Sequence, residues 1–201
     1  MNKELFRETH NLFDTPEKWN AFVELSNFRG EIEFKWLANA TQKVRKHFLD
    51  HPPEYWTFES WDNDVDTRWH LSEFGRSSLA VGFGWNYQFL LHLIDFEKFD
   101  SELITENLRT EKFSPILRCF DRIDRQFETN AKALEYQNFH FGSTNDGRIP
   151  VSELAWYAAH ETDQFVAQAI EKVERFTNDS MITGLMRELN EVSLRGLDGN
   201  S

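Results

Sequence analysis

Three aspartates occupy alternate positions in the middle of the chain, and a glutamate follows at a spacing that could complete a cation site. Asp62, Asp64 and Asp66 lie in the segment FESWDNDVDTRWHLSEF, and Glu73 comes eleven positions after Asp62. Carboxylate oxygens are the ligands that Ca²⁺ and Mg²⁺ take from proteins. A cation bound in this way could also activate water for hydrolysis. These four carboxylates are therefore the candidate metal ligands of the sequence.

The spacing of these carboxylates resembles that of an EF-hand loop, in which positions 1, 3, 5 and 12 bind calcium. The resemblance covers about 17 residues and departs from the family at Thr67, which stands where the EF-hand loop has its sixth-position glycine. Pro52 and Pro53 precede the segment and a strand-like pattern follows it, so the flanking helices of an EF-hand are not expected. The alternative is a β-hairpin in which residues 57–61 pair with residues 67–71 across an acidic turn. The sequence favours the hairpin, and the only cofactor considered is Ca²⁺ or Mg²⁺ at these carboxylates.

A second group with possible chemistry lies on the outer side of a predicted C-terminal helix. Trp156, His160 and Asp163 fall within a turn of one another, nearly opposite the apolar side of that helix. An outward-facing tryptophan is typical of an interface anchor. The alternative is that another element, such as the N-terminal helix, covers Trp156. A catalytic pair of His160 and Asp163 is disfavoured because no nucleophile accompanies it.

Arginines form a third candidate group, on the helix predicted to begin at Ser114 and Pro115. Arg118, Arg122 and Arg125 line one of its faces and could bind a phosphate or an acidic partner. Asp121 precedes Arg125 by four positions, however, which is the ordinary pattern of a solvated helix surface. The sequence favours the solvated surface over an anion-binding site.

The chain is acidic, with a formal net charge of -12, and residues 51–110 contribute 11 acidic and 4 basic residues. A protein that binds nucleic acid normally carries a basic face, so nucleic acid is not expected as the main partner. An acidic surface instead suits a basic protein partner. The sequence has neither a secretion signal nor 18 consecutive apolar residues, and its one cysteine cannot form an internal disulfide. A cytoplasmic location away from membranes is therefore expected.

Helical patterns are expected at both ends of the chain. Thr15 and Pro16 mark a helix start, and this helix is predicted to end near Asn27. After an interruption near Gly30, apolar residues recur every four positions as far as Phe48. Further helix starts are predicted at Ser101, Ser114, Ser152, and Asp179 or Ser180.

Alternating patterns dominate the middle of the chain. Large residues at 79, 81, 83 and 85 alternate with Ala80, Gly82 and Gly84, which predicts a strand with one bulky and one nearly bare face. Residues 55–61 and 67–74 are expected to pair beside it, and residues 87–94 suit either a strand or a helix. We therefore expect one α+β domain over residues 1–201, in which an antiparallel sheet of three to four strands at about 55–94 is packed by helices at 15–50 and 101–194, with a frayed tail at 195–201.

The function favoured by these patterns is an acidic protein–protein interaction module without catalysis, such as an inhibitor, immunity or adaptor protein. The charge distribution and the lack of a complete catalytic set of residues support it. The alternative is a metal-dependent hydrolase or nuclease that uses the carboxylates of the β-rich segment.

Overall fold

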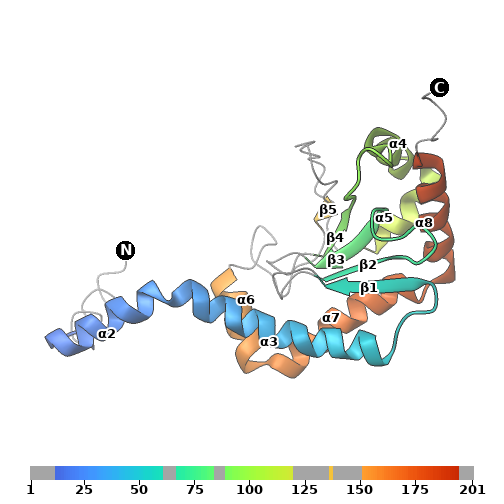
Figure 1. The fold of residues 1–201 in the computed structure, drawn as a ribbon. Helices are drawn as coiled ribbons and strands as arrows, with labels where there is room; N and C mark the ends of the chain where they lie inside the picture. Colours follow the sequence, from blue (N-terminus) through green and yellow to red (C-terminus); the bar gives the residue numbers. More distant parts are fainter. Residues whose placement is uncertain (1–11, 61–66, 84–88, 120–135, 138–150, 195–201) are drawn as a thin grey trace.

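The computed structural model describes residues 12–60, 67–83, 89–119, 136–137 and 151–194. Within these residues the chain has the predicted α+β fold, with a small antiparallel sheet between N-terminal and C-terminal helices (Figure 1). The helices are α2 (Pro16–Asn27), α3 (Arg29–Asp50), α4 (Ser101–Leu108), the 3-10 helix η1 (Glu111–Phe113), α5 (Ser114–Arg118), α6 (Val151–His160), α7 (Thr162–Thr177) and α8 (Ser180–Ser193). None of the helices in these ranges has the length and apolar character needed to cross a bilayer.

The sheet has the strand order β1-β2-β3-β4-β5, and all its described pairings are antiparallel. Its strands are β1 (Trp56–Ser60), β2 (Thr67–Leu71), β3 (Ala80–Phe83), β4 (Phe89–His92) and the two-residue β5 (Tyr136–Gln137). The β1–β2 pairing confirms the predicted hairpin, with Thr57 opposite His70 and Ser60 opposite Thr67. The segment that suited either a strand or a helix forms strand β4.

Helices α3, α7 and α8 contribute to the core that covers one face of the sheet. The ring of Phe48 on α3 lies 4.9 Å from that of Trp69, and the ring of Trp56 lies 5.6 Å from that of Phe176 on α7. The Trp56 indole also donates a hydrogen bond of 3.2 Å to the hydroxyl of Thr183 on α8. Large rings in edge-on contact therefore join the sheet to the helices, as expected for a chain with 15% aromatic residues.

Several predicted helix boundaries are wrong by small amounts. The helical interruption falls at Phe28 rather than at Gly30, which lies inside α3. Asp100, not Ser101, caps α4, because its carboxylate accepts hydrogen bonds from two backbone amides of the first turn. Ser152 lies inside α6, one residue after its described start at Val151.

The last long predicted helix is two helices, because the chain leaves helical geometry at Glu161 between α6 and α7. The alternative start at Asp179 is confirmed as the cap of α8. Helix α5 ends at Arg118, where Cys119 caps it in a turn, so the longer helix predicted from Ser114 is interrupted there, and its predicted continuation beyond Cys119 lies outside the described residues.

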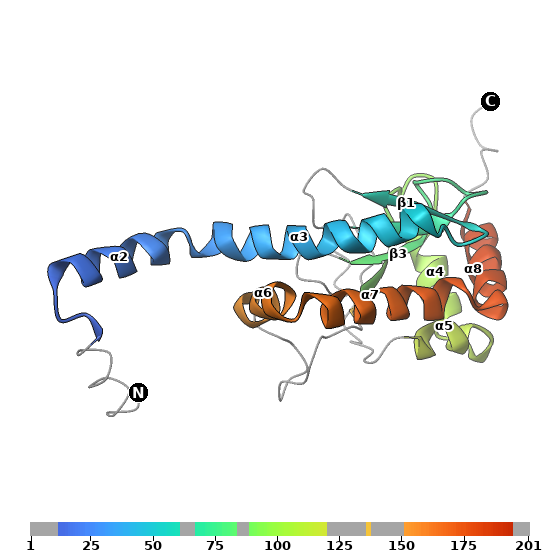
Figure 2. The same cartoon turned by 90° about the horizontal axis from the view of Figure 1, so that it is seen from below.

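Helix α2 and the first turns of α3 stand clear of the rest of the protein. Both views show α2 extending beyond the sheet and the other helices (Figures 1 and 2). No residue of α2 is buried, whereas α3 buries five residues from Leu37 to Phe48. We call residues 12–35 the arm and the remaining described residues the body. Every residue of α2 is exposed, and none of the first turns of α3 up to Lys35 is fully buried.

Candidate functional site

An exposed aromatic group lies where the arm meets the body. Trp156 on α6 is 54% exposed, and its ring lies 4.9 Å from that of His160, tilted by 32°. The His160 ring in turn contacts Trp36 of α3 edge-on, at 5.7 Å. We call Trp36, Trp156 and His160 the shoulder. The alternative expectation was that another helix covers Trp156. Helix α3 does pack beside α6, but it leaves Trp156 largely exposed.

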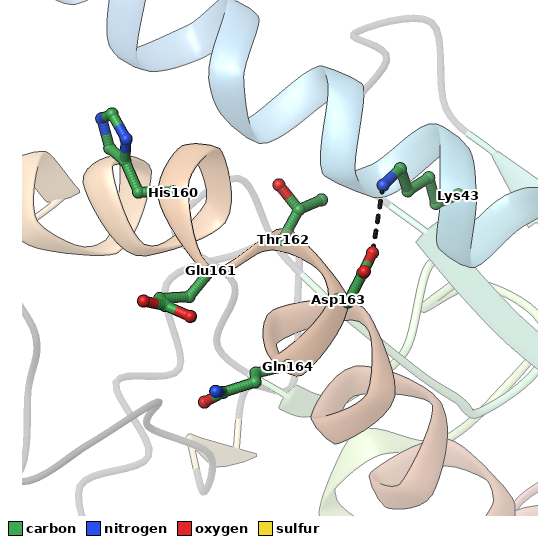
Figure 3. A pocket seen from close by; sticks show the side chains of 6 residues that line it. All are labelled: Lys43, His160, Glu161, Thr162, Asp163 and Gln164. Carbon is green, nitrogen blue, oxygen red and sulfur yellow. Dashed lines mark hydrogen bonds and ion pairs between the residues drawn. The ribbon is translucent and has the colours of Figure 1, made fainter.

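A polar hollow of about 400 Å³ adjoins the shoulder (Figure 3). It is lined by Lys43, His160, Glu161, Thr162, Asp163 and Gln164. Nζ of Lys43 lies 3.3 Å from a carboxylate oxygen of Asp163, whose side chain is 98% exposed. The three residues predicted as an interface, Trp156, His160 and Asp163, thus lie around one open surface.

The break between α6 and α7 shapes this hollow. Glu161 has φ -121° and ψ 41°, outside the helical region, and the Thr162 hydroxyl donates to the carbonyl oxygens of Ala158 and Ala159 at 2.8 and 3.1 Å. These bonds satisfy carbonyls at the end of α6. Figure 3 shows the His160 ring pointing away from the Asp163 carboxylate, an arrangement that suits a binding surface better than a catalytic pair.

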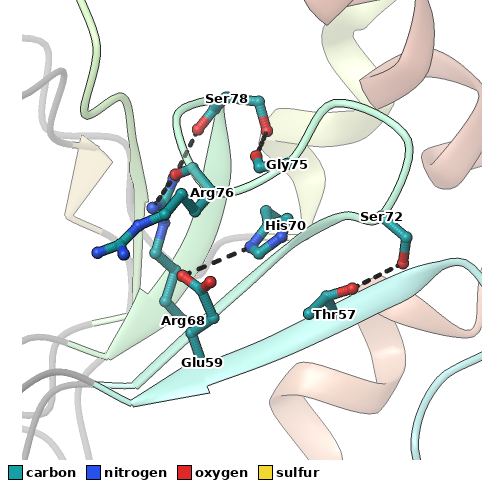
Figure 4. Close-up of polar contacts among 8 residues, drawn as sticks. All are labelled: Thr57, Glu59, Arg68, His70, Ser72, Gly75, Arg76 and Ser78. Atoms are coloured by element: carbon teal, nitrogen blue, oxygen red, sulfur yellow. Dashed lines mark hydrogen bonds and ion pairs between the residues drawn. The ribbon is translucent and has the colours of Figure 1, made fainter.

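A second polar group lies on the sheet face opposite the aromatic core (Figure 4). The pairing places Glu59 opposite Arg68, which is opposite Gly82, and it places His70 and His92 on either side of Ala80. The nearly bare face predicted for β3 is therefore flanked by long polar side chains on the neighbouring strands. Gly82 is required there, because a Cβ would collide with the Thr67 carbonyl oxygen.

Arg68 is fully buried and holds the β2–β3 connection. One of its terminal nitrogens donates to the carbonyl oxygen of Arg76, and the other donates to that of Ser78 at 2.6 Å (Figure 4). Burial lowers the pKa of the guanidinium to about 10, partly opposed by the charge of Glu59. The side chain stays protonated at neutral pH, so a buried cation ties the loop to the sheet.

The two histidines on this face stay neutral at neutral pH. Burial lowers the pKa of His70, and this effect outweighs the nearby Glu59 carboxylate, whose oxygen lies 3.9 Å from Nδ1. Burial and the charge of Arg68 lower the pKa of His92 to about 3. Neutral rings beside a buried cation fit a structural polar layer. No group of three histidine, cysteine or acidic side chains in the described ranges is arranged to hold a metal ion.

The four predicted metal ligands cannot be placed relative to one another in the described part of the chain. Asp62, Asp64 and Asp66 lie outside the described residues. The Glu73 carboxylate accepts a hydrogen bond of 2.5 Å from Nε of Arg187 on α8. The one described carboxylate of the four is therefore engaged in an ion pair that links the sheet to α8.

Of the three predicted anion-binding arginines, the structure describes one. Arg122 and Arg125 lie outside the described residues, and Arg118 is exposed at the end of α5. Its carbonyl oxygen accepts a hydrogen bond of 3.2 Å from the Arg175 side chain. This contact anchors the end of α5 to α7.

Sequence reasoning missed the polar sheet face. Arg68, His70 and His92 were not singled out, although Arg68 and His70 alternate with buried Thr67, Trp69 and Leu71 along β2. That alternation was the available signal, since alternate residues of a strand point to opposite faces.

Comparisons of the chain with protein-family models, curated proteins and solved structures find no match. The geometry of the described residues is therefore the basis for assigning a function.

Proposed function

We propose that the protein is a non-catalytic interaction module that binds a basic partner protein through the shoulder and the adjoining hollow. The observation that supports this most directly is Trp156, a large ring left 54% exposed and held in place by contact with His160. Tryptophans of this kind dominate the binding energy of many interfaces. A ring already fixed by its neighbours loses little conformational freedom when a partner covers it.

The hollow supplies the chemistry for a basic side chain. Glu161 and Asp163 both line it, and Lys43 is the one lysine or arginine among its described lining residues. An arginine or lysine from the partner would pair with these carboxylates, and an arginine could also lie over the Trp156 ring in a cation–π contact. The expected anchor of the partner is therefore a basic residue beside an apolar one.

The charge of the whole chain would assist the approach of such a partner. With a net charge of -12, the protein attracts a basic surface over long distances, and salt screens this attraction. The single cysteine fits action in a reducing compartment such as the cytoplasm. An inhibitor, immunity or adaptor role is consistent with a surface of this type.

The test compares partner capture by the wild type with capture by Trp156→Ala and by Asp163→Lys. Each substitution is expected to lower the recovery of a stoichiometric basic partner at least tenfold, and raised salt should weaken the wild-type complex. Leu49→Ala is the matched control, because Leu49 is 70% exposed on α3 away from the shoulder. Circular dichroism checks that each variant stays folded. Full binding by both Trp156→Ala and Asp163→Lys, or a complex indifferent to salt, would refute the proposal.

A further inference from the structure

The arm repeats, in the open, the helix face that α3 buries in the body. The backbone N–H of Phe28 donates to Glu24 at the end of α2, and its carbonyl accepts from Ile32 at the start of α3, so Phe28 is the one residue that separates the two helices. Steps of three and four residues then connect the buried stripe to the arm. The stripe runs through Trp19, Val23, Ser26, Gly30, Glu33, Leu37, Ala40, Val44 and Phe48.

The same face has opposite environments in its two halves. Leu37, Ala40 and Val44 are at most 2% exposed, whereas Trp19 and Val23 are 52% and 37% exposed. Phe22 lies next to Trp19 and Val23 at 43% exposure, whereas Leu25 and Phe28, at 62% and 53%, are exposed on the opposite side of the arm. An apolar surface of this extent marks an interaction site.

We propose that a second copy of this chain covers it, with the two arms paired antiparallel. The glycine at position 30 is the main evidence that the occupant is a second copy of the chain. It lies in the first turn of α3, its φ is not in the left-handed region, and a Cβ there would meet nothing within 4 Å. A single copy therefore gives no reason for a glycine at this position. A bulky ring packed directly on the backbone does give one.

An antiparallel register provides that ring from the arm itself. When Val23 of one copy lies opposite Ser26 of the other, Trp19 lies opposite Gly30, so that each large side chain meets a small one. Two-fold symmetry repeats both layers.

Charge favours the antiparallel over the parallel arrangement. A parallel pair would bring two strongly acidic bodies together. The arm carries five acidic and three basic residues, so most of the net charge of -12 lies elsewhere in the chain. Antiparallel arms keep the bodies at opposite ends, where solvent and salt screen them from each other.

The size of the contact predicts a reversible dimer. Residues 16–34 span about 28 Å at the helical rise, and two such faces would remove roughly 1,000 Å² from water. This area lies at the low end of specific interfaces. The dimer is therefore expected to dissociate on dilution rather than to be obligate.

Sedimentation equilibrium of the full chain over a wide concentration range tests the proposal. The wild-type mass should rise from 23.9 kDa towards twice that value as concentration increases. Gly30→Leu should weaken association at least tenfold, because the new side chain occupies the place of the Trp19 ring. It should not disturb the monomer, since the space around Gly30 is open. Leu49→Ala is the control and should dimerise like the wild type, and circular dichroism monitors folding of all three.

Orientation is tested by thiol cross-linking in a Cys119→Ser background. A mixture of Asn20→Cys and Asn27→Cys chains should form cross-linked heterodimers with a short bismaleimide, because these two positions flank the same side of the antiparallel seam. Each variant alone should cross-link poorly.

A wild type that stays monomeric at every concentration, or a Gly30→Leu variant that dimerises normally, would overturn the proposal. A monomer whose arm instead captures a different protein would do so as well. Trp156→Ala separates the two proposals, since it should abolish partner capture without changing the dimer.

Discussion

The arm and the body use the same helix face with different results. Phe48, near the end of α3, is 1% exposed and contacts the rings of Phe58 and Trp69, whereas Phe22 on the arm is 43% exposed and contacts the rings of Phe13 and Trp19. Both belong to regular helix, because local hydrogen bonds and end caps suffice to define one. Only the body converts the apolar face into tertiary stability. The comparison shows that local hydrogen bonds and caps are enough to form a helix, whereas burial of its apolar face adds the tertiary stability.

The largest expected difference is between two phenylalanine truncations. Phe48→Ala should lower the free energy of unfolding by about 3–5 kcal/mol, because it leaves a cavity among buried rings. Phe22→Ala should lower it by less than about 1 kcal/mol in the monomer, because that ring is already half in water. Urea unfolding at low protein concentration measures both. Equal losses would mean that the arm folds against the body in solution.

Acid should destabilise the body through its buried histidines. The pKa of His92 is about 3 in the folded protein and that of His70 is also lowered, whereas 6.5 is the ordinary value. The unfolded chain therefore binds more protons as the pH falls below about 6.5, and the free energy of unfolding should decrease with a slope approaching about 1.4 kcal/mol per pH unit for His92 alone.

Unfolding experiments between neutral pH and pH 4 check this slope, with His92→Gln as the variant that should flatten it. Residues 12–35 contain no histidine, so the arm variant Phe22→Ala should keep the wild-type slope. An unchanged slope in His92→Gln would contradict the assignment of a neutral, buried ring at that position.

Removing a helix cap should also have different effects on stability in the body and in the arm. The Asp179 carboxylate accepts hydrogen bonds from Met181 and Ile182 at 2.8 and 3.1 Å, and Asp179→Ala should cost about 1 kcal/mol of global stability. The Thr15 hydroxyl accepts from Lys18 at 3.3 Å, and Thr15→Ala should instead accelerate amide exchange in α2 alone. Urea unfolding and hydrogen exchange report the two effects. A global loss from Thr15→Ala would show that the arm unfolds together with the body.

The smallest effect is expected at the ion pair between Glu73 and Arg187. Both side chains are more than a third exposed, at 47% and 38%, so Glu73→Gln should cost at most about 1 kcal/mol and less in high salt. Thermal melts at two salt concentrations measure it. A cost of several kcal/mol that persists in salt would mean that the pair fixes the position of α8.

The sequence was sufficient for the parts of the fold that depend on local periodicity. The hairpin of β1 and β2, the strand β3 and the start of α8 at Asp179 follow from alternation, turn residues and capping. The break at Glu161 was missed because Leu154, Ala158 and Phe165 continue a helical apolar pattern across it. Likewise, the spacing of Trp19 and Val23 indicates which side of a helix is apolar, but not whether the body reaches far enough to cover it.

The candidate sites were partly predictable for the same reason. Trp156 and His160 lie one turn apart on α6, so helical geometry predicted their contact, whereas Asp163 lies beyond the break at Glu161, on α7. Their hollow also needs Lys43, which is 120 residues from Asp163 along the chain and meets it only through packing of α3. The buried state of Arg68 likewise depends on the loop that its guanidinium holds, at Arg76 and Ser78.

Helix α3 gives the molecule a mechanical property that neither half has alone. Its 22 residues run from Arg29 in the arm to Asp50 beneath the sheet, a length of about 33 Å, and its far end is clamped by the buried Val44 and Phe48. A force or rotation applied near Arg29 is therefore carried along a stiff rod rather than absorbed by a hinge. Whatever grips the first turns of α3 thereby also fixes the direction in which the shoulder faces.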